Sequence, residues 1–170
     1  MQTERPSSSG RDLWKGLLAG AAGGLIATFA MSEFHSLLPR IESESPQGKE
    51  DSTVKAASAI SRAVFHHELT CDQKKIGGSA VHYGFGATMA ALYGALVEFH
   101  ESTRLGWGLP FGMAIWFGAH VVAVPALGLS DPITSTPPAA EAAEFGAHLV
   151  YGAVVESCRN LLRHHCFGSE

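Results

Sequence analysis

The sequence is short of charged side chains. Asp, Glu, Lys and Arg make up 16% of its 170 residues, against about 25% in ordinary soluble domains, while hydrophobic residues make up 46%. The charges are also unevenly placed, because they gather in the segments 1–15, 40–75, 98–104 and 156–163 and leave long uncharged tracts between them. This segregation is typical of a membrane protein rather than of a soluble domain.

A basic cluster and a cysteine framework are also absent from the sequence. The net charge is −4 at pH 7, and no stripe of Lys and Arg is available to meet phosphates, which excludes nucleic acid as a partner. The three cysteines form no CxxC pair and no even-numbered set, so neither a disulfide framework nor a thiolate zinc site is indicated. The sequence also has no nucleophile elbow and no catalytic carboxylate pair at a known spacing, so no feature favours an enzyme.

Four apolar tracts stand where the charges are missing. The clearest runs from Leu105 to Leu129, without Asp, Glu, Lys or Arg, and its 25 residues exceed the roughly 20 that cross a hydrocarbon core as a helix. A soluble four-helix bundle would need a polar face on each helix, and this tract has none. We therefore predict an all-α polytopic membrane protein whose four transmembrane helices form an up-down-up-down bundle, with spans at about 13–38, 76–98, 105–129 and 141–162.

The remaining segments are predicted to flank or connect these spans. Residues 1–12 are interpreted as a disordered N-terminal tail and residues 166–170 as a C-terminal tail, so that the membrane domain covers 13–165. A polar loop occupies 39–75. Within it, apolar residues at helical spacing predict a short amphipathic helix that lies on the bilayer surface: Val54, Ala57, Ile60, Ala63 and Val64.

The positions of Lys and Arg predict that both termini lie in the cytoplasm. The 130–140 link carries no Lys or Arg, whereas five basic residues lie close to span ends on the opposite side: Arg11, Lys15, Arg104, Arg159 and Arg163. The basic residues before the first tract also resemble the start of a secretory signal. Three further spans favour an uncleaved first helix.

Glycines recur at four-residue spacing in two of the tracts. This pattern lets helix backbones approach closely in lipid, either within one chain or between the copies of a homo-oligomer. The predicted packing glycines are Gly16, Gly20 and Gly24 in the first tract and Gly108 and Gly112 in the third.

Ionisable residues inside the tracts fall at one depth. Measured at 1.5 Å per residue from the side where the first and third spans end, they lie roughly 5–13 Å into the membrane. Ionisable groups in a bilayer are costly, usually face inward, and by default mark a functional site. The candidate proton or ligand site comprises Glu33, His82, His120, Glu144 and His148.

Two details of spacing refine this site. Glu144 and His148 are four residues apart, so we expect them to share one helix face, which Tyr151 extends. A carboxylate beside a buried imidazole favours the charged ring, which would bring its protonation near physiological pH. Pro125 follows His120 by five residues, removes a backbone hydrogen bond, and is expected to kink the third helix at the same level.

At the opposite ends of the spans, four charged residues are interpreted as interfacial. Glu98 is expected to pair with Arg104, and Glu156 with Arg159, close to the cytoplasmic surface.

Several functions remain open for the polar layer. Acid–base pairs near one surface could exchange protons with that side and serve proton-linked transport or sensing. The same residues could instead provide interhelical hydrogen bonds, worth about 0.6 kcal/mol each, in a structural or accessory protein. Three imidazoles and a carboxylate also suit zinc, iron, copper or haem, but no tight ligand motif is present, so no metal or cofactor is assigned.

Four stretches of the sequence resemble a known family. They are GLLAGAAGGLIATFA, VHYGFGATMAALYGALVE, WGLPFGMAIWFGAHVVAVPALGLSDP and AEFGAHLVYGAVVE. Together they are similar to the YagU-like bacterial inner-membrane proteins of unknown function, across all four tracts. The resemblance implies a multi-pass protein of the bacterial inner membrane, with the lipid bilayer as its surroundings, and it brings no established reaction.

Overall fold

The computed structural model describes residues 9–38, 50–99 and 106–166, which form helices and turns without a strand. The predicted all-α class is thereby confirmed for this part of the chain. Three helices have 29 residues each: α1 (Ser9–Leu37), α3 (Cys71–Phe99) and α6 (Pro138–Cys166). The shorter elements are α2 (Ser52–Ile60), η2 (Ser61–Phe65), α4 (Leu109–Ile115), η4 (Trp116–Ala123), α5 (Val124–Ala126) and η5 (Ile133–Ser135).

Three helical segments among the described residues are long and apolar enough to cross a membrane. They are Leu13–Leu37, Cys71–Phe99 and the third span Leu109–Ala126, in which α4, η4 and α5 follow one another directly. The prediction of four such helices is corrected here, because α6 has the length but not the apolar character. It carries five charged residues: Glu141, Glu144, Glu156, Arg159 and Arg163.

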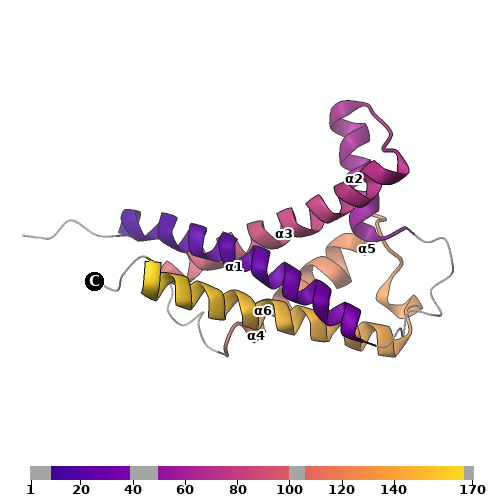
Figure 1. Ribbon diagram of the computed structural model, residues 1–170. Coiled ribbons are helices and arrows are strands. Elements are labelled where there is room, and N and C mark those ends of the chain that lie inside the picture. The colour runs from indigo at the N-terminus through magenta and orange to yellow at the C-terminus, as the bar shows by residue number, and fades with distance from the viewer. Residues whose placement is uncertain (1–8, 39–49, 100–105, 167–170) are drawn as a thin grey trace, which may run out of the picture.

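Successive long helices run in alternating directions (Figure 1). Helix α1 packs against both α3 and α6, α4 packs on α6, and α2 packs on the start of α3. We call the end where α1 begins and α6 finishes the terminal end. The opposite end, where α1 finishes and α6 begins, is the α2 end, and the third span runs toward it (Figure 1).

Glycines bring two pairs of helices into backbone contact. A Cβ on Gly16 would lie 2.6 Å from the carbonyl oxygen of Gly94, and one on Gly24 would lie 2.6 Å from the Cβ of Ala90, so α1 and α3 touch along a glycine seam. Gly20 meets the α3 backbone between them. On the third span, Gly108 and Gly112 meet the α6 backbone at Gly152 and His148. All five predicted packing glycines therefore lie against other helices of the same chain.

The core lies between α1, α3 and α6. Two tyrosines organise it: Tyr93 stacks on Phe111 with ring centroids 4.3 Å apart, and the Tyr151 hydroxyl donates a 2.6 Å hydrogen bond to the carbonyl of Gly86. Large apolar side chains also face outward on these helices, such as Phe29 at 55% exposed. A bilayer solvates such a surface, because lipid tails are as apolar as the side chains. The buried core residues are Ala27, Met31, Ala90, Tyr93, Val97, Ala147, Tyr151 and Val155.

A helix forms where the amphipathic segment was predicted, and its apolar residues divide between two faces. Ala57 is buried and Val54 half-buried, and both meet the paired glycines of α3, since a Cβ on Gly77 would lie 3.0 Å from the Cβ of Ala57. Ile60 and Val64 stay exposed. Only part of the predicted stripe is therefore used for packing within the chain.

Candidate functional site

Five residues form what we call the His–Glu layer, and the first turns of α6 supply three of them. The five are His35, His120, Glu141, Glu144 and His148. Pro138 opens the helix, a position where its missing N–H is not needed. Glu141, Glu144 and His148 follow at i, i+3 and i+7, a spacing that puts the three side chains on one helical face. The face is directed toward two other helices, α1 and the third span, with which these residues make the contacts described next.

Glu141 pairs with His120 across the contact between α6 and η4. The imidazole Nε2 lies 3.1 Å from the Glu141 Oε2, with both side chains mostly covered. The His120 ring also lies close to His148, at a centroid distance of 6.0 Å, and stacks on Trp116 at 6.5 Å with an interplanar angle of 22°. Phe145 closes the far side of Trp116 in an edge-on contact at 5.0 Å.

Glu144 pairs with His35 of α1 and not with His148. The His35 Nε2 lies 3.7 Å from the Glu144 Oε1, which is too long for a hydrogen bond but within range of an ion pair when the ring is protonated. The His148 ring instead donates from Nδ1 to the backbone carbonyl of Glu144 at 2.8 Å. The expected pairing of Glu144 with His148 is therefore corrected: the two share a face, but the backbone oxygen one turn earlier satisfies the ring.

Three of the five predicted site residues come together, His82 lies within electrostatic range of two layer histidines, and Glu33 lies apart. His120, Glu144 and His148 lie in the layer, whereas Glu33 is exposed and forms no ion pair with the described residues. His82 is half-buried on α3, where its ring meets Tyr83 edge-on at 6.0 Å.

Two layer residues, His35 and Glu141, were not among the predicted site residues. Each had a sequence signal. His35 lies near the end of the first apolar tract, at the depth of the other histidines, and two residues from Glu33 on the opposite helix face. Glu141 precedes Glu144 by three residues and so shares its face.

The third span departs from α-helical geometry at the layer. Residues Trp116–Ala123 form a π-helix, and Pro125 lies two residues after its end, so the irregularity expected near Pro125 takes this form. Such helices are rare and are frequent at functional sites. The indole Nε1 of Trp116 is buried and has no hydrogen-bond partner among the described residues. The layer thus holds a spare donor beside His120.

Among the described residues, no group of three or more His, Cys, Asp or Glu side chains is placed to hold a metal ion. The imidazoles and carboxylates of the layer meet in pairs between helices rather than around one point. This arrangement suits exchange of protons within each pair better than coordination of a cation.

A family model described as "Protein of unknown function (DUF1440)" matches residues 25–157. The chain belongs to the DUF1440 family. The DUF1440 match includes every residue of the layer, from His35 to His148. No curated protein and no solved structure shows a significant match to the chain.

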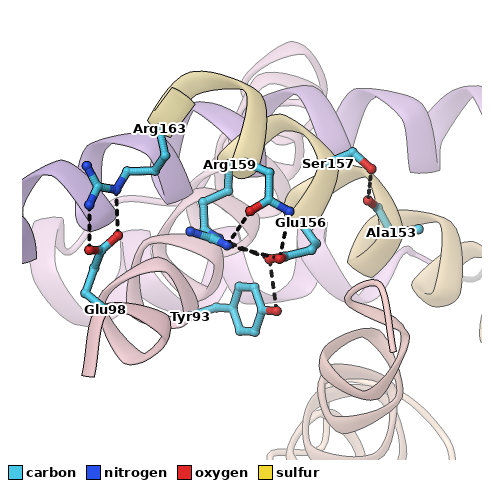
Figure 2. Close-up of polar contacts among 8 residues, drawn as sticks. Tyr93, Glu98, Ala153, Glu156, Ser157, Arg159 and Arg163 are labelled. Atoms are coloured by element: carbon cyan, nitrogen blue, oxygen red, sulfur yellow. Dashed lines mark hydrogen bonds and ion pairs between the residues drawn. The ribbon is translucent and has the colours of Figure 1, made fainter. Parts of the chain in front are cut away.

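A second polar cluster lies at the terminal end, partly beyond the DUF1440 match (Figure 2). The Glu156 carboxylate is only 4% exposed and accepts hydrogen bonds from the Tyr93 hydroxyl at 3.1 Å and from Arg159 Nε at 3.0 Å. Asn160 donates a further bond at 2.9 Å. Glu156 and Arg159 do pair, but both are buried in the bundle instead of lying at its surface.

Glu98 pairs with Arg163 of α6. The guanidinium donates from Nε and Nη2 to the two carboxylate oxygens at 2.7 and 2.8 Å (Figure 2). The expected partner, Arg104, lies outside the described residues. This bidentate hydrogen bond joins the end of α3 to the end of α6. Together with the Glu156 network, it gives the polar side chains of this cluster hydrogen-bond partners.

Proposed function

We propose that this DUF1440 protein is a multi-pass protein of the bacterial inner membrane, similar to the YagU-like proteins, with α6 as a fourth span. The support is the pairing of the charges that α6 carries inward. Glu156 meets Arg159, Glu141 meets His120, and Arg163 meets Glu98. Paired, inward-facing charges are the form in which ionisable groups occur within a bilayer.

The number of spans sets the relative position of the two termini. Reporters fused to the N- and C-terminus should both be active in the cytoplasm, since four crossings return the chain to its starting side. A C-terminal reporter that works only in the periplasm, together with an N-terminal reporter that works in the cytoplasm, would leave three crossings and remove α6 from the membrane.

We also propose that the His–Glu layer makes the protein proton-responsive, in transport or in sensing. The observation that carries this proposal is the 3.1 Å contact between His120 Nε2 and Glu141 Oε2, which joins the third span to α6. Charge-assisted hydrogen bonds are roughly twice as strong as neutral ones. Proton uptake by His120 therefore changes how firmly the third span is held, and the His35–Glu144 pair gives α6 a second contact of the same kind on α1.

Trp116 provides a direct readout of this step. Its ring stacks on His120, and a protonated imidazole quenches indole fluorescence by accepting an electron from the excited state. Trp14 and Trp107 are 47% and 79% exposed, so replacing both with Phe leaves Trp116 as the single tryptophan without disturbing the core. Lowering the pH should then quench the emission in a single sigmoidal step.

Matched variants separate His120 from the other imidazoles. His120→Asn should abolish the quenching step, and Glu141→Gln should shift its midpoint, because the carboxylate facing the ring is lost. His82→Asn is the control, since His82 contacts neither carboxylate of the layer. The proposal fails if His82→Asn and His120→Asn alter the titration equally, or if wild-type emission does not respond to pH.

Reconstitution distinguishes transport from sensing. Liposomes loaded with a pH-sensitive dye should acidify faster with the wild-type protein than with the His120→Asn variant if the layer conducts protons. Equal rates together with an intact fluorescence step would assign the layer to sensing.

The alternative is a structural or accessory protein, in which the layer only holds helices together. The glycine seams and the buried Glu156 network favour it, because they show polar and small residues used for packing in the same bundle. Under this alternative, His120→Asn lowers the melting temperature in detergent and changes neither the fluorescence step nor proton flux.

A further inference from the structure

A cavity of about 340 Å³ opens at the α2 end, and none of its lining residues belongs to the His–Glu layer. Its walls come from α2, from η2 and the residues that follow it, from the start of α3 and from the turn Leu127–Leu129 after α5. The volume falls at the lower limit of small-molecule sites in proteins. It is large enough for a phosphate group and the atoms next to it.

The end of α2 and the π-helix η2 that follows it line the cavity with donors. Lys55 and Ser58 come from α2 and Arg62 from η2, so the hydroxyl stands between two cationic side chains along this wall. The Ser58 Oγ is buried and has no hydrogen-bond partner among the described residues. Neither Lys55 nor Arg62 forms an ion pair within that part of the chain, and both interact with the Glu50 carboxylate only at longer range. Buried hydroxyls are normally hydrogen-bonded, so the Ser58 hydroxyl is available to donate to a bound ligand.

A third cation at the cavity is already paired. Lys74 Nζ lies 2.6 Å from the Oε1 of Glu50, and this hydrogen bond lowers the pKa of Glu50 below its ordinary value. Glu68 also lines the wall. Three cationic side chains therefore face two carboxylates, which leaves the cavity with one positive charge in excess.

The remaining surroundings of the cavity are apolar. Leu127 is 72% exposed beside it, and Ile60 of α2 and Val64 of η2 are exposed in neighbouring turns. If the helices cross a bilayer, this end of the bundle lies where headgroups meet acyl chains. A cationic pocket bordered by exposed aliphatic side chains at that level is suited to a lipid, with its phosphate in the pocket and its chains outside.

We propose that this cavity binds the phosphodiester of an anionic phospholipid. A phosphodiester carries a single negative charge, which matches the single excess positive charge. Its oxygens accept hydrogen bonds from Lys55 and Arg62, and from Ser58 after its side chain turns toward the cavity. A zwitterionic headgroup would bring an ammonium group toward the same two cations. The cavity therefore favours phosphatidylglycerol over phosphatidylcholine, and a lipid over free inorganic phosphate, which offers nothing to the aliphatic border.

Lipid binding can be counted by native mass spectrometry on the full chain in a neutral detergent. Wild-type protein should retain one phosphatidylglycerol at concentrations where phosphatidylcholine does not bind. Arg62→Gln and Ser58→Ala should each weaken that binding about tenfold, as expected when a hydrogen bond to a charged group is lost. Lys75→Gln is the matched control, because it removes the same charge from an exposed position that does not line the cavity.

Ser58→Ala keeps the test valid if Arg62→Gln fails to fold. Its hydroxyl bonds to no described residue, so its lipid-free melting temperature should equal or exceed that of the wild type. Equal binding of phosphatidylcholine, an equal loss in Lys75→Gln, or displacement by millimolar inorganic phosphate would each overturn the proposal. The His120→Asn variant should still bind the lipid, so a failure here is distinct from a failure of the proton-responsive layer.

Discussion

Replacing Glu156 by Gln tests how the terminal end of the bundle is stabilised. Arg159 is 3% exposed and donates two 3.0 Å hydrogen bonds to the Glu156 carboxylate. In Glu156→Gln the side chain keeps its shape but loses its charge, and its amide group must face other donors from Arg159, Tyr93 or Asn160. Leaving a buried cation without its partner costs about 3–5 kcal/mol, which we expect as the loss in free energy of unfolding.

The assay is SDS-induced unfolding of the purified protein in a neutral detergent. The double variant Glu156→Gln with Arg159→Met should recover most of the loss, since an apolar side chain in place of a buried ion is often neutral or stabilising. Glu98→Gln is the comparison, because its pair with Arg163 is more exposed, at 13% and 21%, and should contribute about 1 kcal/mol. A Glu156→Gln variant within 1 kcal/mol of wild type, or a double variant as unstable as the single one, would refute the reasoning.

Three further predictions concern packing and a surface ion pair. Gly20→Ala should destabilise the fold by about 1–3 kcal/mol because its Cβ overlaps the α3 backbone, whereas Gly84→Ala, which meets nothing within 4 Å, should be neutral or stabilising in the same unfolding assay. Tyr151→Phe should cost about 1 kcal/mol through the lost hydrogen bond, and an unchanged melting temperature would contradict this. Lys74→Gln should raise the lowered Glu50 pKa toward its ordinary value, measured by NMR titration; the Glu50–Lys74 contact is therefore present above the ordinary pKa and is lost as pH falls through the lowered one.

The apolar tracts were enough to place the long helices, but the tract 141–162, predicted as a span, lacks the apolar character of the other three. The tract Leu105–Leu129 could be predicted as a span because nothing polar interrupts it except His120. Helix α6 is different, since Glu156 and Arg159 are buried against each other, and no one-dimensional measure registers that two opposite charges cancel. The π-helix at Trp116–Ala123 was also beyond prediction, because Pro125 signals an irregularity but does not specify which kind.

Depth along a helix was predictable for the layer, but side-chain direction was not. His120 and His148 lie together as their depth implies, while Glu33 is at a similar depth and points outward. The i, i+4 spacing correctly placed Glu144 and His148 on one face. It could not show that the His148 ring would donate to the backbone carbonyl of Glu144. The Glu144 carboxylate pairs with His35 instead.

The third span is attached to α6 at two places of different character. At Gly108 and Gly112 the two backbones touch, so the third span is held closely against α6 at this crossing. Eight residues later, roughly 12 Å along the axis, lies the His120–Glu141 contact, which we propose a proton strengthens. The third span leads into Leu127–Leu129, which line the cavity proposed to bind a lipid. If Leu127–Leu129 move when the His120–Glu141 contact strengthens, binding of a lipid must change the affinity for the proton, and binding of the proton must change the affinity for the lipid by the same factor.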